Sequence, residues 1–162
     1  MVKLRSSVCI DAPAAQVWAR LAHLEDIQLW SDAVVSARCA GGRSRGVGAE
    51  RTCDLVGNRT ITERWVAWDE GRSFQYEGFG LPMVARAVNR WSVLPHGEQT
   101  LLTTEAEVVF KGGPLGRVLG LAMAPLMGRM APGALAGFKY LVEHGHPYDG
   151  KAGSLPRPPA YC

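Results

Sequence analysis

Residues 111–145 form the one long stretch of this chain with helical periodicity, and they constrain the fold more than any other segment. Apolar side chains recur there in steps of three and four, at Leu115, Val118, Leu119, Ala122, Met123, Leu126, Met127, Met130, Ala134, Leu135, Phe138, Leu141 and Val142. Charged residues are few in comparison. A helix with so wide an apolar face needs a large apolar partner, so we expect the preceding strands to wrap around it.

One proline of this stretch favours a helix and two disfavour it. Pro114 near the start and Gly145 just past the end are the expected punctuation of a helix. Pro125 and Pro132 each remove a backbone donor inside it, so we predict a kink or a break into two segments near Pro132. These prolines, the glycines and two internal arginines argue against a membrane crossing, and contact with a membrane surface stays open as an alternative.

The composition indicates one globular domain. The chain has 162 residues, 47% of them hydrophobic and 20% charged, which is enough for one substantial core. Its net charge of +3 comes from scattered basic residues, so we expect no nucleic-acid partner. We assign a single ligand-binding domain to residues 1–145. Residues 146–162 lack apolar periodicity and are predicted to be a disordered tail. The oligomeric state is left open.

The cysteines carry no recognisable motif. Cys9, Cys39, Cys53 and Cys162 show no CxxC spacing and no His at ligand spacing, so we predict no metal site, no redox pair and no cofactor. The N-terminus begins with strand-like alternation and not with the apolar core of a signal peptide. We therefore predict a cytoplasmic location.

The rest of the chain predicts strands with two short helices after the first. The helices are expected from Asp11 to about Leu24 and from Asp26 to Trp30, because an Asp cap and an amphipathic pattern occur there. Alternating patterns and turn residues predict seven strands, over residues 2–10, 33–39, 47–55, 59–68, 72–80, 83–94 and 99–110.

The connections between strands predict their registers. A three-residue connection after residue 55 places Arg51 opposite Glu63 and Ala49 opposite Trp65. A turn at Glu70-Gly71 places Trp65 opposite Tyr76 and Ala67 opposite Phe74. A turn at His96-Gly97 pairs Trp91 with Leu102, Asn89 with Thr104 and Ala87 with Ala106. One face of the sheet then carries Arg51, Cys53, Ile61, Glu63, Trp65, Phe74, Tyr76, Asn89, Trp91, Thr104, Ala106 and Val108.

Several segments resemble a known superfamily. These are IDAPAAQVWARLAHLEDIQLW, GVGAERTCDL, ITERWVAWDEGRSFQYE and GPLGRVLG. Over about residues 2–145 the chain resembles the helix-grip fold of the START, birch-pollen-allergen and polyketide cyclase/dehydrase group, also called SRPBCC. The resemblance implies an α+β fold in which a curved, seven-stranded antiparallel sheet surrounds a long C-terminal helix. It also implies a cavity for a hydrophobic ligand, with carriers of lipids, sterols and quinones, hormone receptors, cyclases and dehydratases among the members.

The polar residues of the inner face suggest acid–base chemistry. A carboxylate in apolar surroundings has a raised pKa, so Glu63 is a candidate base, with Arg51 to stabilise an enolate and Tyr76 to donate to a ligand oxygen. A purely structural Arg51–Glu63 ion pair is an equal alternative. The candidate ligand-binding residues are Trp65, Phe74, Asn89, Trp91, Thr104, Met123 and Met127. Cys53 lacks a His partner on this face and is expected to be a buried apolar group.

Three functions are consistent with these patterns. The first is binding of a hydrophobic, ring-containing small molecule by a polyketide cyclase/dehydratase-like enzyme of the lyase type. The second is a non-catalytic carrier or chaperone for a lipid or quinone, favoured by the methionines of the C-terminal helix. The third is a module that docks on a partner or a membrane surface through that helix.

Overall fold

A computed structural model describes residues 1–162 of the chain, apart from the side chain of Met130. The elements in chain order are β1 (Val2–Ile10), α1 (Ala14–Leu21), the 3-10 helix η1 (Leu24–Asp26), α2 (Ile27–Trp30), β2 (Val34–Cys39), β3 (Glu50–Leu55), β4 (Arg59–Asp69), β5 (Ser73–Phe79), β6 (Val84–His96), β7 (Gln99–Phe110), α3 (Gly113–His144) and the 3-10 helix η2 (Ala152–Ser154). Every predicted strand and helix is present, and β3 begins three residues later than predicted.

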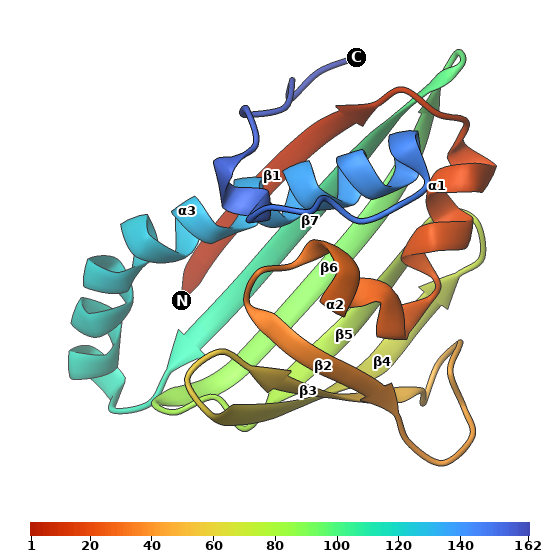
Figure 1. Ribbon diagram of the computed structural model, residues 1–162. Helices are drawn as coiled ribbons and strands as arrows, with labels where there is room; N and C mark the ends of the chain where they lie inside the picture. The colour runs from red at the N-terminus through yellow and green to blue at the C-terminus, as the bar shows by residue number, and fades with distance from the viewer.

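The seven strands form one antiparallel sheet in the order β1-β7-β6-β5-β4-β3-β2. The sheet curves around α3, while α1 and α2 cover the part of the same face that α3 leaves free (Figure 1). The predicted helix-grip architecture is therefore confirmed. The core lies between these layers, where Ile10, Val17, Leu102, Leu135 and Phe138 are all buried.

The registers of β3 and β4 follow the prediction at the site and depart from it beyond the site. Arg51 pairs with Glu63, and Trp65 pairs with Tyr76, as predicted. The predicted pairing of Ala67 with Phe74 is wrong, because a bulge after Trp65 adds one residue to β4.

The register of β6 and β7 differs from the prediction by two residues. Trp91 pairs with Thr104, Asn89 with Ala106 and Ala87 with Val108. The predicted partners are wrong because His96 pairs with Gln99, so that the turn begins one residue later than assumed. A shift of two keeps every side chain on its face, since side chains alternate with a period of two. The set of residues predicted to face inward on β6 and β7 is therefore unchanged.

Helix α3 is continuous from Gly113 to His144 with Pro125 and Pro132 inside it. Of the two predicted outcomes near Pro132, a kink or a break, the break does not occur. The helix changes direction in its N-terminal half, where it leaves the sheet (Figure 1). Its C-terminal half approaches α2 so closely that a Cβ at Gly137 would collide with the carbonyl oxygen of Trp30.

Residues 146–162, which we predicted to be disordered, run back over α3 (Figure 1) and contact the rest of the domain at Ala152 and at Pro159. The Asp32 carboxylate accepts hydrogen bonds from the backbone amides of Ala152 and Gly153, at 2.9 Å each. The Cys9 amide donates to the Pro159 carbonyl at 2.8 Å.

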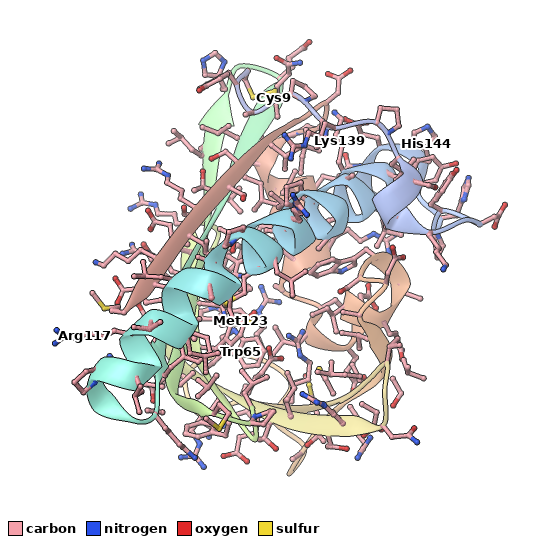
Figure 2. The ribbon with its side chains drawn as sticks, turned by 90° about the vertical axis from the view of Figure 1, so that its left-hand side faces the viewer. Cys9, Trp65, Arg117, Met123, Lys139 and His144 are labelled. Carbon is pink, nitrogen blue, oxygen red and sulfur yellow. A yellow bond between two sulfur atoms is a disulfide. The ribbon has the colours of Figure 1, made fainter. Side chains whose placement is uncertain are left out.

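A disulfide joins Cys9 to Cys162 (Figure 2). The sequence analysis did not predict this disulfide, because the bond links positions 153 residues apart and leaves no local spacing motif. Disulfides persist chiefly in oxidising compartments, so this bond does not support the cytoplasmic location, which stays a prediction.

Candidate functional site

A cavity of about 490 Å³ lies between the sheet and α3. Its walls come from β1, β6, β7, the middle of α3, the loops that follow α2 and β5, and η2. The lining residues are Leu4, Ser6, Ser31, Asp32, Ala33, Leu81, Ala87, Asn89, Trp91, Thr104, Ala106, Val108, Met127, Arg129, Ala131, Gly133, Ala134 and Gly153. This volume is within the range of about 300–1,000 Å³ that is usual for small-molecule sites.

The lining is mainly apolar, with a few polar groups in defined places. Asn89 and Thr104 lie on adjacent strands, β6 and β7, beside the wall that Trp91 forms. An amide and a hydroxyl can each donate and accept hydrogen bonds, so this corner can orient a ligand oxygen. Charged side chains occur at the exposed rim, where Asp32 and Arg129 lie. The Asp32 carboxylate already accepts hydrogen bonds from the backbone amides of η2.

A second polar group, the Arg51–Glu63 pair, is buried in the sheet. The two side chains are 5% and 8% exposed. Arg51 Nε donates to Glu63 Oε2 at 2.8 Å, and Nη2 donates to the same oxygen. Arg51 Nη1 donates to the carbonyl oxygen of Leu24, which ties the pair to η1. Burial of two charges is costly, and these hydrogen bonds offset much of that cost.

The surroundings of this pair hold its neighbours in their neutral forms. Burial raises the pKa of Tyr76, and the negative charge of Glu63 raises it further. Burial also raises the pKa of Cys53 to about 12, so its thiol is protonated at neutral pH. A protonated, buried thiol is a poor nucleophile, which agrees with the expected role of Cys53 as a buried apolar group.

An aromatic cluster packs beside the pair and fills the space between β4, β5 and α1. The centroid of Trp65 lies 5.7 Å from that of Phe74 and 4.9 Å from that of Tyr76. The Arg51 guanidinium carbon is 5.0 Å from the Trp65 ring centroid, within the range of a cation–π interaction. Trp18 of α1 closes the cluster at 5.9 Å from Phe74. These aromatic side chains therefore pack against one another as part of the hydrophobic core.

The family described as "Polyketide cyclase / dehydrase and lipid transport" matches residues 1–143. The chain belongs to this family. The match covers the whole sheet and all of α3 except its last residue, and it agrees with the SRPBCC resemblance of the sequence motifs. No curated protein sequence matches the chain significantly.

Solved structures share the fold of this family member. The protein TTHA0849 from Thermus thermophilus is 19% identical with a TM-score of 0.71, over 89% of this chain and 99% of the other. Norcoclaurine synthase from Thalictrum flavum is 16% identical with a TM-score of 0.66, over 89% and 95%. The di-domain ARO/CYC StfQ from the steffimycin pathway is 13% identical with a TM-score of 0.72, over 89% and 51%. Identities this low show the fold alone.

The structure separates the predicted site residues of this family member into two groups. Asn89, Trp91, Thr104 and Met127 line the cavity. The remaining candidates are outside its lining: the pair Arg51 and Glu63, the cluster residues Trp65, Phe74 and Tyr76, and the half-buried Met123 of α3. Arg51, Glu63 and Tyr76 do come together as predicted, in a place that the cavity does not reach. Their catalytic role stays a prediction.

Sequence analysis missed part of the lining. Leu4 and Ser6 follow the alternation of β1 and were recognisable as inward-facing residues. Asp32 and Gly153 had no such indication, because their place depends on the path of the tail. Within the described part of the chain, no group of three or more His, Cys, Asp or Glu side chains is placed to hold a metal ion.

Proposed function

We propose that the protein binds a hydrophobic, ring-containing small molecule in this cavity and carries it without chemical change. The observation that supports a carrier is the separation of the cavity from the buried acid–base pair. Glu63 is held by two hydrogen bonds from Arg51 and lies outside the cavity lining, so a bound ligand does not meet it. The inner lining offers apolar surface, an amide and hydroxyls instead.

The shape of the lining favours a flat ligand. The indole of Trp91 forms one wall and is backed by Trp30 at 5.7 Å between ring centroids. A rigid aromatic wall suits a ring, since stacked and edge-to-face contacts both stabilise it. Met127 on the opposite side has an adaptable thioether side chain that fits irregular ligands.

The first test is to identify what the protein retains. Native mass spectrometry of the purified protein, followed by organic extraction, should detect a quinone, lipid or polyketide-like compound that leaves the protein unaltered. A fluorescent hydrophobic probe gives a second measurement if the cavity is empty after purification. A protein that retains no compound and binds no probe contradicts the proposal.

A pair of variants tests the location of the ligand. Ala106→Phe places a ring inside the cavity, whereas Ala67→Phe places the same ring on an exposed part of β4. We expect A106F to weaken probe binding at least about ten-fold, equivalent to about 1.4 kcal/mol, and A67F to bind like wild type. Circular dichroism checks that both variants are folded. Equal binding by all three proteins would place the ligand elsewhere.

A second candidate function is a polyketide cyclase/dehydratase-like enzyme. It is favoured by the proximity of Arg51, Glu63 and Tyr76 and by the fold shared with the ARO/CYC StfQ. In this case Glu63 would take a proton next to a ligand carbonyl, after release from Arg51. Glu63→Gln should then abolish turnover of an aromatic polyketide precursor analogue while sparing its binding. An unchanged precursor in the wild-type reaction would exclude this function for that substrate.

A further inference from the structure

The N-terminal half of α3 presents a row of apolar side chains to solvent. Leu115, Val118, Leu121 and Leu126 are 80%, 65%, 74% and 54% exposed. At about 100° per residue, they fall within an arc of about 140° on the helix. We call these four residues the outer face of α3. Single exposed apolar residues are ordinary, whereas several on one helix face form a patch that can contact a partner or a membrane.

The two halves of α3 differ in what they contact. In the C-terminal half, Leu135, Phe138 and Leu141 are 1%, 0% and 1% exposed. The whole helix is long and apolar enough to cross a membrane by length and composition. Because the C-terminal half of α3 is buried in the core, the whole helix cannot insert across a bilayer without unfolding the domain. The outer face can still contact the surface of a bilayer.

The charged residues of the chain segment that carries the outer face are all basic. Lys111 precedes the helix, Arg117 lies beside the face, and Arg129 follows its last residue. Arg117 points away from the body of the protein at the N-terminal end of α3 (Figure 2). The sequence between Glu107 and Glu143 contains no acidic residue. This pattern, an aliphatic helix face with basic neighbours, is that of helices that lie in the surface of anionic membranes.

A second copy of the chain fits the outer face less well. The stripe from Leu115 to Leu126 is roughly 17 Å long and about 10 Å wide, or roughly 170 Å². A stable dimer buries about 800 Å² on each partner. A two-fold dimer centred on this stripe would also bring the basic residues of both copies together, since the same patch meets itself. We propose that the outer face of α3 docks the protein on an anionic lipid bilayer.

Docking in this way would bring the rim of the cavity to the membrane. Leu81, Met127 and Arg129 all line the cavity, and Arg129 follows the outer face on α3. The loop after β5 contacts the chain just before α3, where the Lys111 amide donates a hydrogen bond to the Met83 carbonyl at 2.8 Å. Met83 is 57% exposed and extends the apolar surface at this end. Docking itself does not depend on the proposed ligand binding, although it would suit a carrier that exchanges its ligand with a membrane.

Vesicle flotation of the delipidated protein tests the proposal. We expect the wild type to float with vesicles that contain phosphatidylglycerol and to stay behind with phosphatidylcholine alone. Val118→Glu combined with Leu121→Glu should abolish flotation. A matched control, Val35→Glu with Leu94→Glu, changes two side chains that are 65% and 58% exposed on other parts of the protein, and it should float like wild type.

The basic residues give an independent measurement. Lys111→Gln with Arg117→Gln should weaken binding to anionic vesicles by about twenty-five-fold, because each basic residue at such a surface contributes roughly five-fold. Circular dichroism of every variant confirms the fold.

Three results would overturn the proposal. The first is a wild type that does not float with anionic vesicles. The second is a control variant that loses flotation as completely as the outer-face variant. The third is a wild-type dimer, detected by analytical ultracentrifugation, that the V118E/L121E variant dissociates, since this would assign the outer face to a second copy. Because the delipidated protein is used, a failure here leaves the result of the ligand-retention test independent.

Discussion

Replacing Glu63 with Gln should destabilise the protein strongly, because it leaves the Arg51 charge buried without its counter-charge. The Arg51 side chain is 5% exposed and would keep its hydrogen bond to the Leu24 carbonyl and its contact with the Trp65 ring. Breaking a buried ion pair from one side costs about 3–5 kcal/mol. The Gln oxygen still accepts one hydrogen bond, so we expect a loss of about 3 kcal/mol in the free energy of unfolding.

The expected change in melting temperature follows from the size of the protein. At this chain length, 1 kcal/mol corresponds to about 2–4 °C, so E63Q should lower Tm by about 6–12 °C. Urea unfolding followed by tryptophan fluorescence and far-UV circular dichroism measures the free energy directly. The variant Arg51→Met combined with Glu63→Leu removes both charges and should recover most of the loss, since apolar replacements of a buried pair are often neutral.

A neighbouring ion pair on the other face of the same two strands supplies the control. Glu50 and Arg64 pair across β3 and β4 with side chains 34% and 56% exposed. Exposed pairs contribute about 0–1 kcal/mol, so Glu50→Gln should change little. A loss in E63Q no larger than that in E50Q would refute the assignment of Arg51–Glu63 as a desolvated structural pair.

Three further predictions concern the acid limit, the disulfide and the free thiols. Hydrogen bonds from Arg38 and two neighbouring hydroxyl groups lower the pKa of Asp54 to about 2, so its stabilising contribution is present above about pH 4 and is lost as the pH falls toward 2. Asp54→Asn should therefore flatten the stability curve in that interval, measured by urea midpoints at each pH, and an unchanged curve would contradict this cause. Cys162→Ser opens the disulfide to Cys9 and should lower the free energy of unfolding by about 2–5 kcal/mol, with added reductant destabilising the wild type but not the variant. In a Cys39→Ser background, Cys53 should stay unreactive toward a thiol reagent at pH 8 until urea unfolds the protein, because its pKa is about 12; prompt labelling of the folded variant would show that the thiol is accessible.

The sequence predicted the parts of the fold that depend on local pattern. The alternation of β3 and β4 and the short connection between them were enough to pair Arg51 with Glu63. The bulge after Trp65 was not predictable, because nothing in the local composition distinguishes the extra residue from its neighbours. Local pattern also left open whether α3 kinks or breaks near Pro132. The helix does not break there, because packing of its C-terminal half against the core overrides the local cost of a proline.

The candidate site was predictable as a face and not as a cavity. Period-two alternation identified Asn89, Trp91 and Thr104 as inward-facing even with the register of β6 and β7 displaced. Alternation cannot say which inward side chains meet a ligand and which pack against one another. That division depends on where α1 and α3 cover the sheet, which places Trp65 and Phe74 in solid core.

The path of the tail has a consequence for solubility. Strand β1 is an edge strand of the sheet. An edge strand of an open sheet offers unpaired amides and carbonyls to other chains. Here the carbonyl of Pro159 accepts a hydrogen bond from the Cys9 amide. The nearby prolines at 156 and 158 have no amide hydrogen that could pair with a further strand. The tail thus ends the ladder instead of extending it. A protein shortened before residue 156 would expose this margin of β1 and become prone to self-assembly through strand addition.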